Sequence, residues 1–256
     1  MPTRPDRFPI LQARPVHDSI NSVTHAQQEL AGLQLTPEQQ HDLNHRVEID
    51  FVCATMALEG SAVSREQVAG ESAGTAANAG TTGEDRSGIL VVLHAIRAVR
   101  ALVEKHGREA TLTPSLLLNI QSGSDQSSPG KELSAQPLPE PAAATRLLAR
   151  LESVCHWFTA ESFAELHPAE QASIVLLRLI ELKPFDEGNT RTALAAASLF
   201  ALRSQLPPII IEPEMQLAYR TALSEGVKMN TKPMVDVVAQ ALVKTARDLV
   251  ERASSK

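Results

Sequence analysis

The chain has 256 residues, of which 43% are hydrophobic and 21% are charged, so it can bury the core of one large domain or two small ones. A net charge of −6 gives no general attraction to nucleic acid or anionic lipid, and any phosphate binding must therefore be local. No apolar run reaches the roughly 18 to 20 residues of a membrane span, and the amino-terminal residues lack the apolar stretch of a signal peptide. We therefore expect a cytoplasmic protein with neither a nucleic-acid nor a membrane partner.

Almost all of the hydrophobic periodicity is helical, which predicts an all-α fold of about nine helices. Residues 1–35 are irregular and proline-containing, with a short helical candidate around Ser22 to Leu30, and are predicted to form an N-terminal arm. Residues 36–256 are predicted to form a single helical domain. Its first helix is opened by a capping box at Thr36 with Pro37 at the first helical position, and it ends at Gly60.

The middle of the chain alternates helical and irregular stretches. Residues 70–88 are rich in small residues and are predicted to form a flexible loop, followed by a helix from Ile89 to Lys105 whose Arg97 and Arg100 are expected to be solvated. A short helix is predicted from Thr113 to Ile120. Residues 121–142 then contain too much Gly, Ser and Pro for a stable helix or a central strand.

The last part of the chain is predicted to be helical, apart from a short extended piece at residues 207–211. The predicted helices run over Ala143–Phe158, Leu166–Leu182, Thr192–Ser204, Met215–Leu223 and Met234–Arg252. The two cysteines, Cys53 and Cys155, lie within apolar helical patterns and are predicted to be small buried hydrophobic residues.

An acidic, glycine-containing turn from Lys183 to Arg191 separates two of these buried helices. Pro184 ends the first helix, and the strongly helix-forming run from Thr192 predicts the second. The residues between them therefore lie just before or within the first turn of a helix, where free backbone N–H groups and the positive end of the helix favour a phosphate. Asp186 or Glu187 can meanwhile hold a divalent metal that shares the same phosphates.

The turn resembles the core motif of the Fic (Fido) family, His-x-Phe-x-Asp/Glu-Gly-Asn-Gly-Arg-x-x-Arg, which also joins two central helices. The matching residues are Pro184, Phe185, Glu187, Gly188, Asn189 and Arg191. Lys183 replaces the histidine, Thr190 the second glycine and Leu194 the final arginine. The resemblance spans roughly Thr36 to Met229 and includes a His-Pro segment at residues 166–172.

A second signature of this family lies upstream, where residues 55–60 resemble the inhibitory-helix pattern Ser/Thr-x-x-x-Glu-Gly/Asn and Glu59 takes the inhibitory position. The resemblance thus implies that residues 36–60 form an inhibitory-like helix. It also implies that residues 121–142 correspond to the flap that pairs with the backbone of a target protein. Three prolines in this stretch remove hydrogen-bond donors, so the flap is expected to be eroded.

The resemblance implies a reaction in which the nucleotidyl (AMP) group of ATP is transferred to a hydroxyl group of a protein, with Mg²⁺ as the metal. Lys183 lies at the position of the catalytic histidine, Glu187 at the metal position, and Gly188, Asn189, Thr190 and Arg191 at the nucleotide and phosphate positions. A free lysine has a pKa of about 10.4 against about 6.5 for histidine, so it is a poor proton acceptor at neutral pH. We therefore predict a Fic-fold protein with impaired or lost transferase activity and a residual nucleotide site.

Two alternatives remain open at the level of sequence. One is an active Fic enzyme with altered chemistry, such as transfer of another phosphate-linked group or de-AMPylation. The other is a ligand-free interaction scaffold in which Lys183 forms an ion pair within the old pocket. Without an arginine at position 194, Glu59 is expected to face only Arg191 or Lys183, or to be a solvated residue at the end of its helix.

Overall fold

The computed structural model describes residues 18–74, 81–123 and 141–254. Within these ranges every regular element is a helix and there is no strand, which confirms the all-α fold. The helices are α1 (Asp18–Ala31), α2 (Pro37–Leu58), α3 (Arg65–Ser72), α4 (Gly83–His106), η1 (Gly107–Glu109), α5 (Pro114–Ser122), α6 (Pro141–Trp157), α7 (Glu161–Ala164), α8 (Pro168–Leu182), α9 (Asn189–Leu202), η2 (Pro213–Met215), α10 (Gln216–Val227) and α11 (Lys232–Ser254). The α-helices beyond the nine expected are the short α3 and α7.

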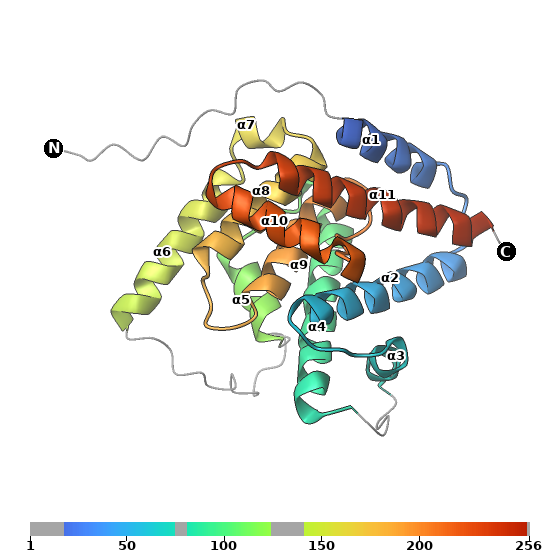
Figure 1. Ribbon diagram of the computed structural model, residues 1–256, viewed down its shortest axis with the longest axis horizontal. Coiled ribbons are helices and arrows are strands. Elements are labelled where there is room, and N and C mark those ends of the chain that lie inside the picture. The colour runs from blue at the N-terminus through green and yellow to red at the C-terminus, as the bar shows by residue number, and fades with distance from the viewer. Residues whose placement is uncertain (1–17, 75–80, 124–140, 255–256) are drawn as a thin grey trace.

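Helices α8 and α9 pack against each other at the centre of the molecule (Figure 1). Every residue of α9 from Thr192 to Ala201 is buried, because α4, α5 and α2 also pack against this helix. Five of these ten residues are alanines, whose small side chains let several helices approach the same axis. Helices α10 and α11 pack against α8. The turn between α8 and α9 is therefore held by the most buried part of the fold.

Helix α1 lies alongside α11 (Figure 1). Its apolar face buries Ile20, Val23 and Ala26, and the hydroxyl of Ser19 donates a hydrogen bond of 2.8 Å to Oδ1 of Asp236. Residues 18–31 of the predicted arm thus pack on the C-terminal helix. The rest of the arm lies outside the described residues, and the domain boundary at residue 35 stays a prediction.

The loop predicted over residues 70–88 is shorter than expected. Residues 70–72 belong to α3, and α4 begins at Gly83, six residues before the predicted start. Thr82 explains the early start, because its side chain accepts a hydrogen bond of 3.0 Å from the backbone N–H of Asp85 and so caps the helix. Residues 121–122 and 141–142 of the predicted flap region are also helical. The remainder of that region, residues 124–140, lies outside the described residues.

The expectation that Arg97 and Arg100 are solvated is wrong for Arg100, whose side chain is only 15% exposed, whereas the side chain of Arg97 is 46% exposed. Both guanidinium groups on α4 bind the carboxylate of Glu48 on α2, with distances of 3.1 Å from Nε of Arg97 and 2.6 Å from Arg100. Glu48 is only 8% exposed. This ion pair joins the helix that precedes Glu59 to α4. Cys155 is buried as expected, and burial raises the pKa of its thiol to about 12, whereas Cys53 is only half-buried.

Candidate active site at the turn between α8 and α9

The motif turn begins where α8 ends. Lys183 adopts a left-handed backbone conformation with φ of 42°, and its N–H donates to the carbonyl of Leu179 at 3.1 Å. Pro184 then prevents a further helical turn. At the other side of the turn Gly188 is the N-cap of α9, with φ of 71°. The prediction that this tract lies between two helices, at the start of the second, is confirmed by the structure.

Asn189 closes the turn on itself. Its side-chain oxygen accepts a hydrogen bond of 3.1 Å from the N–H of Phe185, and its side-chain nitrogen donates to the carbonyl of the same residue at 2.6 Å. The ring of Phe185 is half-buried against the core. Both ends of the Asn189 amide are therefore used in holding the turn, which gives this residue a structural role whether or not a ligand binds.

The guanidinium group of Arg191 lies directly over Gly188. A Cβ atom added at Gly188 would lie 2.5 Å from Nε and 2.7 Å from one terminal nitrogen of Arg191, closer than real contacts allow. Glycine is thus favoured here by the positive φ, and it leaves room for the guanidinium group in its present position. The Nε atom of Arg191 is buried and has no hydrogen-bond partner within the part of the chain that the structure describes.

Glu59, the residue after the last turn of α2, reaches this same arginine. One carboxylate oxygen accepts from the backbone N–H of Arg191 at 3.3 Å, and the other accepts from its guanidinium group at 3.1 Å. The two side chains are 21% and 20% exposed. Glu59 therefore faces Arg191 and not Lys183, and its carboxylate occupies a first-turn N–H of α9 where an anion would bind.

The segment that follows Glu59 is tied to another helix. The hydroxyl of Ser61 donates to Oδ1 of Asp85 in the first turn of α4, and Thr82 donates to the other oxygen at 2.7 Å. These bonds lower the pKa of the Asp85 carboxyl, the bond from Ser61 most. The contact between Ser61 and Asp85 is not predictable from the sequence, because no local pattern brings residues 24 positions apart together.

Three charged residues that precede Gly188 in the turn are exposed to solvent. Lys183, Asp186 and Glu187 are exposed, and none of them forms an ion pair with another described residue. The described part of the chain also contains no group of three His, Cys, Asp or Glu side chains arranged for a metal ion. The salt bridge expected of a ligand-free scaffold, between Lys183 and a nearby carboxylate, is thus not formed.

The two remaining departures from the family motif lie within α9. Thr190 is in the first helical turn, where its Cβ is compatible with the backbone. Leu194, at the position of the final arginine, is 1% exposed and belongs to the core. It lies one turn beyond Arg191 on the same face of the helix.

His167, in the His-Pro segment, is the N-cap of α8. The ring Nδ1 of His167 accepts a hydrogen bond of 3.2 Å from the backbone N–H of Ala169. The backbone N–H of His167 donates to the carboxylate of Glu170, also at 3.2 Å. Nε2 lies 3.4 Å from the hydroxyl of Thr24 on α1. Burial lowers the pKa of this imidazole, against the opposing effect of Glu170.

Comparison with known proteins agrees with this geometry. Residues 94–201, which contain the motif turn, match the model of the Fic/DOC family. Over 100 residues the chain is 32% identical to protein adenylyltransferase fic-1 of Caenorhabditis briggsae, and over 107 residues it is 29% identical to protein adenylyltransferase Fic of Drosophila virilis. These matches cover 39% and 42% of this chain, but only 20% and 21% of the relatives. The matched region thus spans about one fifth of the length of the curated relatives.

Solved structures extend the likeness to nearly the whole chain. A Fic-1 fragment from C. elegans superimposes with a TM-score of 0.76 at 21% identity, covering 91% of this chain and 70% of the fragment. A Fic domain-containing signaling protein from Bacteroides thetaiotaomicron superimposes with a TM-score of 0.73 at 17% identity, covering 93% and 99% of the two chains. Identities this low establish the fold alone. The protein has the fold of Fic domain proteins, and its residues 94–201 match the Fic/DOC family.

One further property follows from the helices themselves. Among the described residues, no helix combines the length and the hydropathy that crossing a bilayer requires.

Proposed function

We propose that this chain is a nucleotide-binding Fic-fold protein with impaired AMP-transferase activity, and that Glu59 closes its phosphate site. The observation that supports the proposal most is the seating of the Glu59 carboxylate on the N–H and guanidinium groups of Arg191. A carboxylate and a phosphate are both anionic acceptors and use the same donors. A nucleotide phosphate and Glu59 therefore compete for Arg191.

The turn itself offers groups that favour binding of phosphate. The buried Nε of Arg191 has no hydrogen-bond partner among the described residues, so its donor capacity is unused. The start of α9 presents the N–H groups of its first turn, and Gly188 leaves room for the arginine beside them. Lys183 adds an exposed ammonium group at the same turn, which suits a phosphate clamp.

The acidic residues of the turn fit a magnesium ion that arrives with ATP. Asp186 and Glu187 are exposed and offer the oxygen atoms that Mg²⁺ prefers, and Mg²⁺ is usually held by one or two carboxylates together with substrate phosphates. Glu187 occupies the metal position of the family motif. When bound, the ion would neutralise charge on the phosphates, while Arg191 and the α9 amides would orient them.

The impairment follows from Lys183. Transfer to a protein hydroxyl requires a group that removes the hydroxyl proton, and a protonated ammonium group donates hydrogen bonds but accepts none. The family relatives named as adenylyltransferases supply the precedent for ATP and for a protein target as partners. For this chain we propose binding of the nucleotide, with transfer far slower than in a member that carries histidine.

Isothermal titration calorimetry with ATP and Mg²⁺ tests the binding. Removing the competing charge by Glu59→Gln is expected to tighten binding at least tenfold, and adding Arg191→Gln to that variant is expected to abolish it. Glu38→Gln is the matched control, since Glu38 lies in the exposed first turn of the same helix. Absence of binding by the wild type and by Glu59→Gln, with both proteins folded, would refute the proposal.

Incubation of the same proteins with labelled ATP and a cell lysate tests the chemistry. We expect neither a modified protein nor released nucleotide above background for the wild type and for Glu59→Gln. Rapid transfer or hydrolysis by either protein would instead support the alternative of an active enzyme with altered chemistry.

A further inference from the structure

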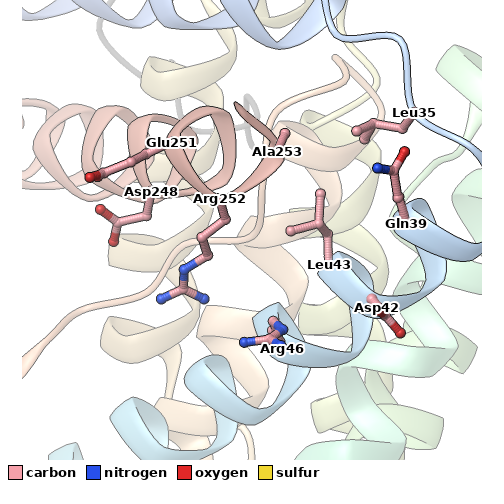
Figure 2. Close-up of a pocket in the computed structure, with 9 residues that line it drawn as sticks. All are labelled: Leu35, Gln39, Asp42, Leu43, Arg46, Asp248, Glu251, Arg252 and Ala253. Atoms are coloured by element: carbon pink, nitrogen blue, oxygen red, sulfur yellow. The ribbon is translucent and has the colours of Figure 1, made fainter. Parts of the chain in front are cut away.

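Helix α2, which precedes Glu59, is held differently at different points along its length. At its amino-terminal half, a cavity of about 480 Å³ lies between it and the carboxyl-terminal end of α11 (Figure 2). In its middle, the buried carboxylate of Glu48 binds Arg97 and Arg100 on α4. The end of α2 is joined to α4 as well, through Ser61. The contacts between α2 and α4 therefore extend to the neighbourhood of Glu59, which does not line the cavity.

The backbone after α2 forms a tight turn that contains Glu59. The N–H of Gly60 donates to the carbonyl of Ala57 at 3.2 Å. The N–H of Ser61 donates to the carbonyl of Met56 at 2.9 Å. These two bonds form a Schellman motif, which needs a residue of positive φ, and Gly60 supplies it with φ of 92°. The main chain thus holds Glu59 and Ser61 in a fixed relation to each other.

The side chain of Ser61 ties this turn to α4. Its hydroxyl donates to Oδ1 of Asp85 in the first turn of α4, and the hydroxyl of Thr82 donates to Oδ2 at 2.7 Å. The pKa of Asp85 is lowered, most of all by the bond from Ser61, so the acceptor is ionised at neutral pH. Hydrogen bonds to an ionised carboxylate are stronger than those between neutral groups. Both oxygens of this carboxylate are therefore held in place.

Glu59 and Ser61 are two positions apart, and their partners lie on two different helices. Glu59 binds Arg191 on α9, and Ser61 binds Asp85 on α4. Helices α4 and α9 pack against each other, so the turn bridges two elements that are themselves joined. Two residues of extended chain span at most about 7 Å, so the bond at Ser61 limits how far Glu59 can move from the guanidinium group.

We propose that Ser61 and Asp85 form an anchor that positions Glu59 on Arg191, and that breaking this anchor opens the phosphate site to a nucleotide. The second part rests on the proposed function, in which Glu59 and a nucleotide phosphate compete for Arg191. Ser61 touches no ligand and acts through Glu59, so it is a positioning residue. The occupancy of Arg191 by Glu59 is thus set by a contact on α4, outside the motif turn.

Amide hydrogen exchange of Arg191, followed by NMR without nucleotide, tests the anchor directly. The N–H of Arg191 donates to Glu59, so its exchange reports whether Glu59 is in place. Loss of the anchoring hydrogen bond in Ser61→Ala or Asp85→Ala is expected to raise the exchange rate by about fivefold. Ser61→Thr keeps the hydroxyl and is expected to exchange as the wild type does. Ser87→Ala is the matched control with the same expectation, because Ser87 is exposed on α4, two residues after Asp85.

A double-variant comparison tests whether the anchor acts through Glu59. Glu59→Ala is expected to raise the exchange rate of the Arg191 amide more than Ser61→Ala does, and adding Ser61→Ala to it is expected to have no further effect. A general loss of structure would instead add to the effect of Glu59→Ala. The proposal is overturned by additive effects, or by equal exchange rates in the wild type and folded Ser61→Ala. Urea unfolding checks the fold, and Asp85→Ala takes the place of Ser61→Ala if the latter is unfolded.

Calorimetric titration with ATP and Mg²⁺ tests the second part. Ser61→Ala is expected to bind ATP about threefold more tightly than the wild type, because Glu59 is displaced more easily but still competes. Faster Arg191 exchange in Ser61→Ala without ATP binding by any variant would refute the proposed function and leave the anchor supported. Faster exchange with ATP affinity unchanged from a wild type that binds would refute the link between the anchor and the phosphate site.

Discussion

Glu59 and Arg191 lie 132 positions apart in the chain and are joined by two hydrogen bonds, one to the main chain of Arg191 and one to its side chain. In the first bond, the Glu59 carboxylate accepts from a backbone N–H in the first turn of α9, which has no partner within the helix. In the second, it pairs with the guanidinium group of Arg191. The guanidinium group reaches this position because Gly188 has no side chain. The contact between Glu59 and Arg191 thus depends also on Gly188.

Replacement of Gly188 by alanine is expected to destabilise the protein more than the backbone conformation alone explains. Alanine at φ of 71° costs about 1 to 2 kcal/mol, and the added Cβ also displaces the guanidinium group of Arg191. Gly74→Ala is the control, since Gly74 has φ of 66° and open space around its Cβ position. Urea denaturation should show a loss at position 188 that exceeds the loss at position 74 by at least about 1 kcal/mol. Equal losses would show that Arg191 moves aside without cost.

The buried carboxylate of Glu48 is expected to be important for stability. Glu48→Ala leaves Arg97 and Arg100 without their shared acceptor, and breaking a buried ion pair typically costs about 3 to 5 kcal/mol; because the Arg97 side chain is 46% exposed, we expect about 3 kcal/mol. Glu181→Ala, which removes a more exposed pair with Arg178, should change the free energy of unfolding by less than about 0.5 kcal/mol. Chemical denaturation of each variant measures the change in the free energy of unfolding. Similar losses for the two variants would mean that water replaces Glu48 effectively.

Stability is expected to fall in mild acid because of His167. Its Nδ1 must be unprotonated to accept from the N–H of Ala169, and burial lowers the pKa of the folded-state imidazole. The unfolded chain therefore binds the proton more tightly, so the free energy of unfolding decreases as the pH falls below about 6.5, the ordinary histidine value. Glu170 and Thr24 face the ring, and Glu170 opposes the effect.

His167→Asn isolates this contribution, since asparagine also caps helices and does not titrate. Urea unfolding at pH 7.5 and 5.5 should show a smaller acid-induced loss for the variant than for the wild type, while the other histidines contribute equally to both. An identical loss in the two proteins would assign the acid sensitivity to other groups.

Restoring the family motif is expected to create transferase activity. The triple change Lys183→His, Thr190→Gly and Leu194→Arg supplies a proton acceptor and a second arginine, which lies one helical turn from Arg191 at a position that is buried in the wild type. Self-modification in the presence of ATP and Mg²⁺, detected as an added AMP group by mass spectrometry, is the expected result. The addition of Arg191→Gln should abolish it. If the folded triple variant stays inactive even with Glu59→Gln, the cause of the impairment lies outside these positions.

Much of the local structure was predictable from the sequence. The capping box at Thr36, the proline after Lys183 and the alanine-rich run after Arg191 predicted where α2 begins, where α8 ends and how α9 continues. These features act over one helical turn, so neighbouring residues are enough to reveal them. The early start of α4 was missed because the capping residue, Thr82, lies within a stretch rich in small residues that resembles a loop.

The sequence by itself determined the longer helices, their order and the turn that carries the motif, but not the short α3 and α7, because hydrophobic period, caps and helix breakers are properties of adjacent residues. Only the tertiary structure decided that Glu59 binds Arg191 and not Lys183, that Glu48 neutralises Arg97 and Arg100, and that α1 covers α11. Each of these pairings depends on how whole helices pack against one another. The partners are 49 or more positions apart, and no local pattern encodes which side chains meet across such a distance.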